Sequence, residues 1–532
     1  MRKTFFFLLA VLFFGLGLSC GNSQPGEAPK TISRDTSILP GNSYSELFFD
    51  SLDLERFLET RKLPDTARSL MRNFYNQRNF QYAWFDSSGL AEQAGAFWNL
   101  QENYIAYSGD SSIYNPFLQG WADSALAYGK NAIPSSIRPE VEWQLTLQFF
   151  RYAAKAYMGD RHLNERDLQW FIPRKKADIL SLLDTLIKEK GKSISSYEPV
   201  NRQYQLLREE LKKYHTIQAE GGWQPLVPKK KKYQLGDSLP EISQIKHRLY
   251  LTGDFNSPDT SDLFTPELEA AVKGFQRRYG MKEDGAIGGG TLREMNQPIE
   301  NRIKQILVNM ERIRWVPEEP KGDYVLVNIP EFKAHIYEQG KLVFDMNVVV
   351  GTTQNNTVIF TGKLKHVVFS PYWNVPPGIL KNEVLPGIKR NPNYLARHNM
   401  KWNGGQVRQK PGPSNSLGLV KFLFPNSYNI YLHDTPSKSL FKQEKRAFSH
   451  GCIRVSEPKK FAQWILRDEA SWTDDAINAA MNAGKEKYVT VKKDINVFIG
   501  YFTAWVDRDG KLNFRDDIYG HDKRMADKMF GK

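Results

Sequence analysis

The apolar side chains of this 532-residue chain change their spacing near Asp323. Before that residue they recur at helical intervals, and Trp143, Leu147 and Phe150 share one helical face. After it, short segments such as residues 324–329 are rich in β-branched and aromatic residues with a period of two. A chain of this length exceeds a single hydrophobic core. We therefore expect a multidomain α+β protein, helical first and mainly antiparallel β afterwards.

The formal net charge is +14, so the surface is basic. Such a surface attracts nucleic acid, anionic membranes or an acidic polymer, and charge alone does not choose among them. The densest basic run, Lys229 to Lys232, follows Pro228 directly and has no interleaved aromatic residues. This pattern favours a solvated linker, and we expect no nucleic-acid partner.

The first residues have the layout of an export signal. Arg2 and Lys3 precede an apolar stretch at residues 5–18, which is too short to span a bilayer comfortably and is followed by small residues. We therefore predict a signal peptide at residues 1–19 and an exported protein.

The chain has two cysteines, Cys20 and Cys452. In an oxidising compartment the two could form a disulfide. Cys20, however, ends the signal, and Leu18-Ser19-Cys20 resembles the lipobox of bacterial lipoproteins, although Gly17 replaces the usual aliphatic residue. The resemblance implies a lipid on Cys20, membrane anchoring, and a polar tether at residues 20–43. Cys452 is then a lone thiol.

Three folded regions follow the tether. Residues 44–225 are predicted to form a helical scaffold domain with an aromatic core. Residues 236–298 form a compact unit in which Thr265 is a candidate N-cap before Pro266, and Thr291 with Glu294 suggests a capping box. Residues 299–532 form the sheet domain. A Pro-, Gly- and Asn-rich segment at about 376–418 interrupts it and is predicted to be a functional cap.

The segment Ser449-His450-Gly451-Cys452-Ile453-Arg454-Val455 carries the chemistry. A cysteine attacks as its thiolate, so it needs a neighbouring base or a lowered pKa. His450 is one candidate base, Arg454 is a nearby cation, and the backbone N–H groups of Gly451 and Cys452 are candidate oxyanion donors. Because Val455 is expected to open a helix, Cys452 is also expected near a helix N-terminus.

A second candidate base lies nineteen residues upstream in Tyr431-Leu432-His433-Asp434. His433 ends a predicted strand, and a period of two places Tyr431 on the same strand face. A strand end beside a strand-to-helix turn is a plausible way to bring His433 to Cys452.

Together, His433-Asp434 and Ser449-His450-Gly451-Cys452-Ile453-Arg454 resemble the signature of YkuD-type L,D-transpeptidases. Residues 369–376 and the run from Thr503 to Gly520 are similar to the large periplasmic branch of that family, with its helical scaffold and peptidoglycan-binding module. The elements Phe275-Gln276 and Asp284-Gly285 look like that three-helix module. A spacer of the same fold that has lost its ligand is the alternative for the module.

The resemblance implies a role for each residue. Cys452 is the nucleophile and His433 its general base, oriented by the backbone carbonyl of Asp434, with His450 the rival base. The remaining candidates line the site, bind substrate or hold the turn: Tyr431, Ser449, Gly451, Arg454 and Trp373. For Arg454 a structural ion pair and for Trp373 a core position remain alternatives. The implied reaction is acyl transfer from a tetrapeptide stem, with release of D-alanine and formation of a 3→3 cross-link, and carbapenems are expected to acylate the cysteine.

Other functions remain open. Water could resolve the acyl-enzyme, which would make the protein an L,D-carboxypeptidase or a cross-link cleaver, and a related variant would attach a protein to the wall. A non-catalytic wall-binding lipoprotein is a second alternative. The expected partners are peptidoglycan stem peptides and glycan. No metal or cofactor is expected, because the nine histidines form no HxH or HExxH pair.

Overall fold

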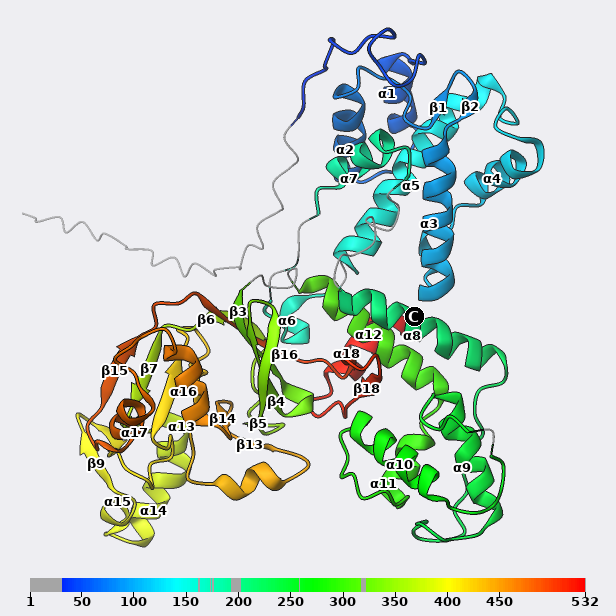
Figure 1. Cartoon of the computed structure of the whole chain (residues 1–532). Coiled ribbons are helices and arrows are strands. Elements are labelled where there is room, and N and C mark those ends of the chain that lie inside the picture. Colours follow the sequence, from blue (N-terminus) through cyan, green and yellow to red (C-terminus); the bar gives the residue numbers. More distant parts are fainter. Residues whose placement is uncertain are drawn as a thin grey trace, which may run out of the picture. The chain divides into compact units, whose positions relative to one another are not determined.

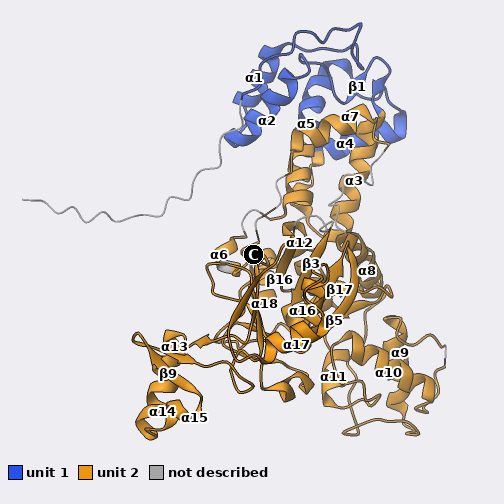
Figure 2. Cartoon of the chain, turned by 60° about the vertical axis from the view of Figure 1, so that its left-hand side comes forward, with its two compact units in different colours: residues 1–91, 117–147 blue, residues 92–116, 148–532 orange. Residues whose placement is uncertain are grey.

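The computed structural model describes residues 31–160, 163–172, 174, 177–192, 202–257, 259–316 and 322–531. Cys20 and the predicted export signal lie outside these residues. The chain divides into two compact units, residues 1–91 with 117–147, and residues 92–116 with 148–532 (Figure 2). No helix in the described ranges combines the length and apolar character that a membrane crossing requires.

The first unit is helical, as predicted, and is built around a buried carboxylate. Glu142 accepts hydrogen bonds from the backbone N–H groups of Ala83 (2.6 Å) and Trp84 (2.9 Å) and from the hydroxyl of Tyr75 (2.9 Å). These donors compensate for the loss of water around a fully buried charged group. The elements of this unit are α1 (Ser51–Glu59), α2 (Asp65–Asn76), β1 (Phe85–Asp86), β2 (Gly89–Leu90), α4 (Pro116–Tyr128) and the first part of α5 (Arg138–Met158).

The second unit contains further helices before the sheet. Helix α8 (Arg202–Ala219) packs along α12 (Ile299–Trp315), and the guanidinium of Arg314 donates to the hydroxyl of Tyr204 at 2.7 Å. The helical spacing of apolar residues in α8 predicts one buried face, and the residues of that face are all buried: Tyr204, Leu207, Leu211 and Tyr214. The other helices are α3 (Glu92–Ser108), α6 (Glu165–Leu168) and α7 (Ile179–Lys188).

The compact three-helix unit is also present. It consists of α9 (Pro240–Leu251), α10 (Pro266–Arg278) and α11 (Gly289–Met295) (Figure 1). Thr265 caps α10 by accepting the N–H of Leu268 at 3.3 Å, as predicted. The predicted capping box is wrong. Helix α11 begins two residues before Thr291, with Gly288 at its N-cap, so Thr291 is a buried residue inside the helix.

The motif residues of this unit have a structural role. The buried amide of Gln276 donates to the carboxylate of Asp284 (2.9 Å) and to the carbonyl of Ala286 (2.9 Å), and it accepts the N–H of Gly285 (2.9 Å). Gly285 has φ +70°, a conformation that favours glycine. The side chain of Gln276 therefore fixes the turn that leads into α11.

The rest of the second unit is a long, curled sheet. Eleven strands pair in the order β15-β7-β11-β12-β14-β5-β4-β3-β16-β6, with β13 attached to β5, and most neighbours are antiparallel. Three pairs are parallel: β12 with β14, β13 with β5, and β3 with β16. The strands are β3 (Asp323–Asn328), β4 (Lys333–Glu338), β5 (Lys341–Gly351), β6 (Phe360–Lys363), β7 (His366–Phe369), β11 (Val420–Leu423), β12 (Leu432–His433), β13 (Ala447–Ser449), β14 (Ile453–Val455), β15 (Lys487–Thr490) and β16 (Ile495–Gly500).

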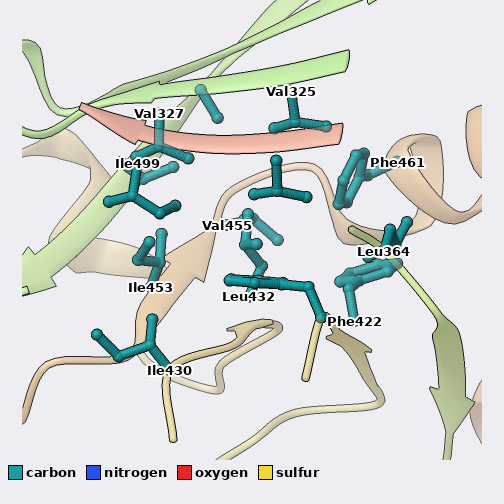
Figure 3. Close-up of a cluster of buried hydrophobic side chains, with 14 of the residues drawn as sticks. Val325, Val327, Leu364, Phe422, Ile430, Leu432, Ile453, Val455, Phe461 and Ile499 are labelled. Atoms are coloured by element: carbon teal, nitrogen blue, oxygen red, sulfur yellow. The ribbon is translucent and has the colours of Figure 1, made fainter. Parts of the chain in front are cut away.

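The curl of the sheet encloses the main core. Side chains of Val327 and Ile499 face Leu432 and Ile453 across it, and Phe461 lies beside them (Figure 3). Phe461 belongs to α16 (Pro458–Leu466), and α17 (Asp474–Asn482) follows. Leu432 and Ile453 are completely buried, so the strands that carry the candidate site are anchored by the centre of the core.

The interrupting segment has structure of its own. It contains α13 (Pro377–Ile379), the π-helical turn η5 (Leu380–Val384), α14 (Leu385–Arg390) and α15 (Tyr394–Arg397), with a three-stranded sheet of β8 (Trp373–Asn374), β10 (Gln406–Gln409) and β9 (Met400–Asn403). A small apolar cluster of Val375, Val384 and Val407 holds it together. The irregular composition therefore hides a compact insertion.

Two boundaries differ from the sequence prediction. Val455 ends strand β14 instead of opening a helix, because Ile453 and Val455 both point into the core and Pro458 is the first residue of α16. The alternating apolar pattern of residues 497–506 predicts one strand, but the structure splits it into β16 and β17 (Ala504–Val506), and β17 pairs with β18 (Leu512–Phe514). Helix α18 (His521–Phe530) closes the described chain.

Candidate active site

The register of one parallel strand pair gathers the candidate residues on one face. Leu432 of β12 lies opposite Ile453 of β14, and His433 lies opposite Arg454. Since Leu432 and Ile453 point into the core, the alternating residues point to the other face of the sheet. His433 and Arg454 therefore share a face. Tyr431 lies two residues before His433, and Cys452 two residues before Arg454, so both lie on the same face.

The thiol of Cys452 is half-buried and reduced. It donates a long hydrogen bond, 3.6 Å, to the carbonyl of Asn429, and no hydrogen bond joins it to His433 among the described residues. Burial raises the pKa of Cys452, which the neighbouring Tyr431 and the charge of Arg454 only partly oppose. The resting side chain of Cys452 is therefore a thiol. The helix N-terminus expected beside it is absent from this position, because α16 begins at Pro458.

His433 is held as a neutral imidazole. Its Nδ1 donates to the carbonyl of Asp434, which leaves Nε2 as the basic nitrogen. Burial, followed by the charges of Arg454 and Lys421, outweighs the carbonyls of Asp434 and Leu417 and lowers the pKa of His433 to about 3. His433 is thus an unprotonated base throughout the neutral pH range.

Arg454 supplies positive charge beside both groups. Its Nε is buried and has no hydrogen-bond partner in the described part of the chain. Burial lowers the pKa of Arg454, and the neighbouring Cys452 raises it. No ion pair involves this guanidinium within the described residues, so the alternative of a structural salt bridge has no support there.

Replacing Arg454 by methionine should raise the pKa of the Cys452 thiol further, because the guanidinium charge favours the thiolate. The measurement is the pH dependence of Cys452 alkylation by iodoacetamide, a neutral reagent. The variant profile should move to higher pH. Lys365→Met, an exposed lysine, is the matched control and should leave the profile in place. An unmoved profile in the Arg454 variant would contradict this electrostatic role.

Ser449 and Gly451 build the turn before Cys452. The hydroxyl of Ser449 donates to the carbonyl of Cys452 (2.5 Å) and accepts the N–H of Gly451 (3.1 Å). Gly451 has φ +112°, and its carbonyl accepts the hydroxyl of Thr357 at 2.9 Å. Its N–H is therefore engaged within the turn. Of the two predicted oxyanion donors, only the N–H of Cys452 has no hydrogen-bond acceptor in the described part of the chain.

Tyr431 and Asp434 flank His433. Burial first, and then the neighbouring Cys452, raise the pKa of the Tyr431 hydroxyl, and the Tyr431 ring lies 5.7 Å from the imidazole centroid. The buried carboxylate of Asp434 accepts the N–H groups of Thr435 (2.7 Å) and Leu419 (2.8 Å) and pairs with Lys438. Asp434 thus fixes the loop whose backbone carbonyl orients His433.

The structure separates two predicted residues from this group. His450 is half-exposed and forms an ion pair with Glu383 of η5 in the insertion, with 3.0 Å between Nε2 and Oε1. Trp373 lies in β8, where it is half-buried and packs against the apolar cluster of the insertion. His450 therefore faces the insertion, and Trp373 belongs to its core.

One residue of the same face was missed from the sequence. Lys421 of β11 lies directly opposite His433 and only 13% of its side chain is exposed. The apolar residues at 420–423 predict a strand, and the alternation of Val420, Lys421 and Phe422 within it places Lys421 on the face opposite the core. What the sequence did not supply was the pairing of β11 with β12.

Three domain models match the chain. Residues 69–211 match a scaffold domain, residues 238–295 match a model described as "Putative peptidoglycan binding domain", and residues 322–489 match the YkuD L,D-transpeptidase catalytic domain. A protein described as "Putative L,D-transpeptidase" from Haemophilus influenzae is 34% identical over 246 residues, which cover 42% of this chain and 49% of that protein. The chain thus spans about half the length of this curated relative.

Solved L,D-transpeptidases are also similar to this chain. One from Xylanimonas cellulosilytica is 15% identical, covers 52% of this chain and 100% of its own, and has a TM-score of 0.18. One from Stackebrandtia nassauensis is 16% identical, covers 52% of this chain and 98% of its own, and has a TM-score of 0.20.

His433, Cys452 and Arg454 all lie within the segment matched by the catalytic-domain model. The same segment forms most of the curled sheet on whose outer face these residues meet. The chain therefore contains a segment that matches the YkuD-type L,D-transpeptidase catalytic domain, together with segments that match a scaffold domain and a peptidoglycan-binding domain.

Proposed function

We propose that this protein is a peptidoglycan L,D-transpeptidase in which Cys452 is the nucleophile. The observation that supports the proposal best is the shared face of Cys452, His433 and Arg454 on the β12–β14 pair, inside the matched catalytic domain. A half-buried thiol, a neutral imidazole and a cation are the groups that acyl transfer requires.

The first step forms an acyl-enzyme. The sulfur of Cys452 attacks the carbonyl carbon of the third stem residue, a diamino acid, while His433 accepts the thiol proton. The tetrahedral oxyanion is stabilised by the N–H of Cys452 and the charge of Arg454. The C–N bond to the terminal D-alanine then breaks, and His433 returns the proton to the leaving amine.

The second step transfers the acyl group. The side-chain amine of another stem attacks the thioester, gives a proton to His433, and releases the thiol as its sulfur is reprotonated. The product is a 3→3 cross-link. Water in place of the amine would give the hydrolase, an L,D-carboxypeptidase or cross-link cleaver. A non-catalytic wall-binding protein is the alternative in which Cys452 does not react.

We further propose that the protein is exported to the periplasm and anchored by a lipid on Cys20, with peptidoglycan stems and glycan as its partners. The support is the charged and apolar layout of residues 1–19, the position of Cys20 directly after them, and the peptidoglycan-binding domain match. The Cys20→Ala variant tests the anchor: it should leave the membrane fraction, and a variant that stays there would contradict lipid anchoring through Cys20.

Incubation with a carbapenem should give one adduct per chain by intact-protein mass spectrometry, because an activated β-lactam acylates a catalytic thiol. Cys452→Ala should show no adduct. A second measurement, with a tetrapeptide donor and an amine acceptor, then separates cross-linking from hydrolysis. Well-folded wild-type protein without an adduct would favour the non-catalytic alternative.

A further inference from the structure

The active face of the sheet continues past His433. The cross-strand row runs from Arg454 through His433 to Lys421 of β11, Val368 of β7 and Tyr488 of β15. Lys421 is therefore the direct neighbour of His433 on the side away from Arg454. The proposed mechanism gives no role to this buried lysine.

Lys421 belongs to a group with more positive than negative charge. Its Nζ lies 3.8 Å from the carboxylate of Glu486, which also accepts the N–H of Tyr372 at 2.9 Å. Arg408, from strand β10 of the insertion, lies over the ring of Tyr372 at 4.0 Å from its centroid. Glu486 is thus paired with Lys421, whereas Arg408 has no ion pair within the described ranges.

The charge of these two cations is incompletely compensated. The Nε of Arg408 is buried without a hydrogen-bond partner in the described ranges. Burial, and in part the charge of Arg408, lower the pKa of Lys421 despite Glu486. Uncompensated buried charge is costly, whereas an incoming carboxylate would accept hydrogen bonds from both cations. This group, Lys421 with Arg408, is called the basic pair below.

The position of the basic pair relative to His433 indicates which carboxylate it binds. His433 must protonate the leaving amine, so the leaving residue lies on the His433 side of the scissile bond. The carboxyl carbon of that residue is only two covalent bonds from the leaving nitrogen. Lys421 is the next side chain along the row from His433.

We propose that Lys421 and Arg408 bind the free terminal carboxylate of the D-amino acid that leaves the donor stem. This inference rests on the proposed function and names a determinant of its substrate. The pair makes the enzyme select stems that end at the leaving residue. A longer stem places an uncharged amide at the same point and leaves both cations without an anion. The insertion, through Arg408, completes this part of the site.

The test compares two donors that differ at one group. A tetrapeptide with a free terminal carboxylate and the same peptide with a terminal carboxamide are supplied with wild-type protein, and release of D-alanine or D-alaninamide is measured. Loss of a charged partner at a desolvated pair costs on the order of 100-fold in kcat/KM. Wild type should therefore prefer the acid donor by about this factor.

The variants assign the preference to residues. Lys421→Met should reduce the preference for the acid donor to within about threefold, chiefly by slowing the reaction of that donor. Lys421→Arg should retain most of the preference. Arg408→Gln, in the insertion, provides a second test that does not alter the catalytic sheet. The matched control Lys365→Met should keep the full preference. A third donor carries an amide only on the carboxylate of the diamino acid. Wild type should turn over this donor as efficiently as the unmodified peptide.

The outcomes separate the two proposals. Equal use of the acid and carboxamide donors by wild type would overturn the carboxylate site and leave the transpeptidase intact. A preference that follows the diamino acid carboxylate, or that survives in both Lys421→Met and Arg408→Gln, would also overturn it. If wild type releases neither leaving group and Cys452 gives no carbapenem adduct, the proposed function fails. Alkylation of Cys452 by iodoacetamide verifies an accessible thiol in every variant.

Discussion

Replacing His433 by glutamine should slow acylation of Cys452 by about 10³-fold, within the range of general base catalysis. The resting thiol has a raised pKa and donates to the carbonyl of Asn429, so it does not ionise on its own at neutral pH. His433 is the buried neutral imidazole on the same face, and its Nδ1–H is engaged by the carbonyl of Asp434, so Nε2 is the nitrogen that can take a proton. The measurement is single-turnover acylation by a carbapenem, followed by mass spectrometry.

His450→Gln is the matched control for this prediction. His450 is nearer to Cys452 in sequence, but it is half-exposed and paired with Glu383, and exposed ion pairs contribute little. We expect a loss of less than about tenfold. A larger loss in the His450 variant than in the His433 variant would make His450 the base.

Mild acid should destabilise the catalytic sheet and helix α18 through one buried histidine in each. The pKa of His433 is lowered to about 3 by burial, Arg454 and Lys421, and that of His521 to about 3 by burial, Arg312 and Arg524. The unfolded chain binds these protons below about pH 6.5. Their contribution to stability is therefore complete above that pH and is lost as the pH falls toward 3. Each histidine should remove about 2 kcal/mol between pH 6 and pH 4.5.

Hydrogen exchange of the β12 and β14 amides measures this loss within the sheet, since a chain of several domains does not unfold in one step. His433→Gln should lose about 2 kcal/mol less than wild type over the same interval. The comparison isolates His433, because the other titrating groups are present in both proteins. Glu331 titrates in a lower pH interval. Burial raises the pKa of its carboxyl group, but His335 outweighs this effect and lowers the pKa to about 2. Equal losses in the two proteins would show that His433 titrates normally.

Local signals in the sequence predicted most of the elements. Thr265 and Pro266 marked the start of α10, and alternation placed Tyr431 and His433 on one strand face. Val455 was wrongly assigned to a helix because strand β14 has only three residues. So short an alternating pattern cannot be distinguished from the start of the helix that follows. The Thr291 capping box failed for a similar reason, since Gly288 and Gly289 start that helix without a side-chain cap.

The long-range pairings could not be predicted in the same way. A period of two gives the face of a residue but not the identity of the neighbouring strand. The pairing of β11 with β12 brings Lys421 to His433, and the insertion brings Arg408 to Lys421. Neither Lys421 nor Arg408 lies in a recognisable sequence motif. The role of Ser449 depends on one turn, in which its hydroxyl contacts both Gly451 and Cys452.

The alternation along β12 and β14 determines which kinds of genetic change the site tolerates. Leu432 and Ile453 fill the core while His433 and Cys452 lie on the opposite face. Deletion or insertion of one residue in either strand would exchange the two sets, exposing apolar groups and burying Cys452 or His433. Point substitutions in the insertion carry no such penalty. Lineages of this protein are therefore expected to keep the length of these strands fixed, while positions of the insertion other than Arg408 vary.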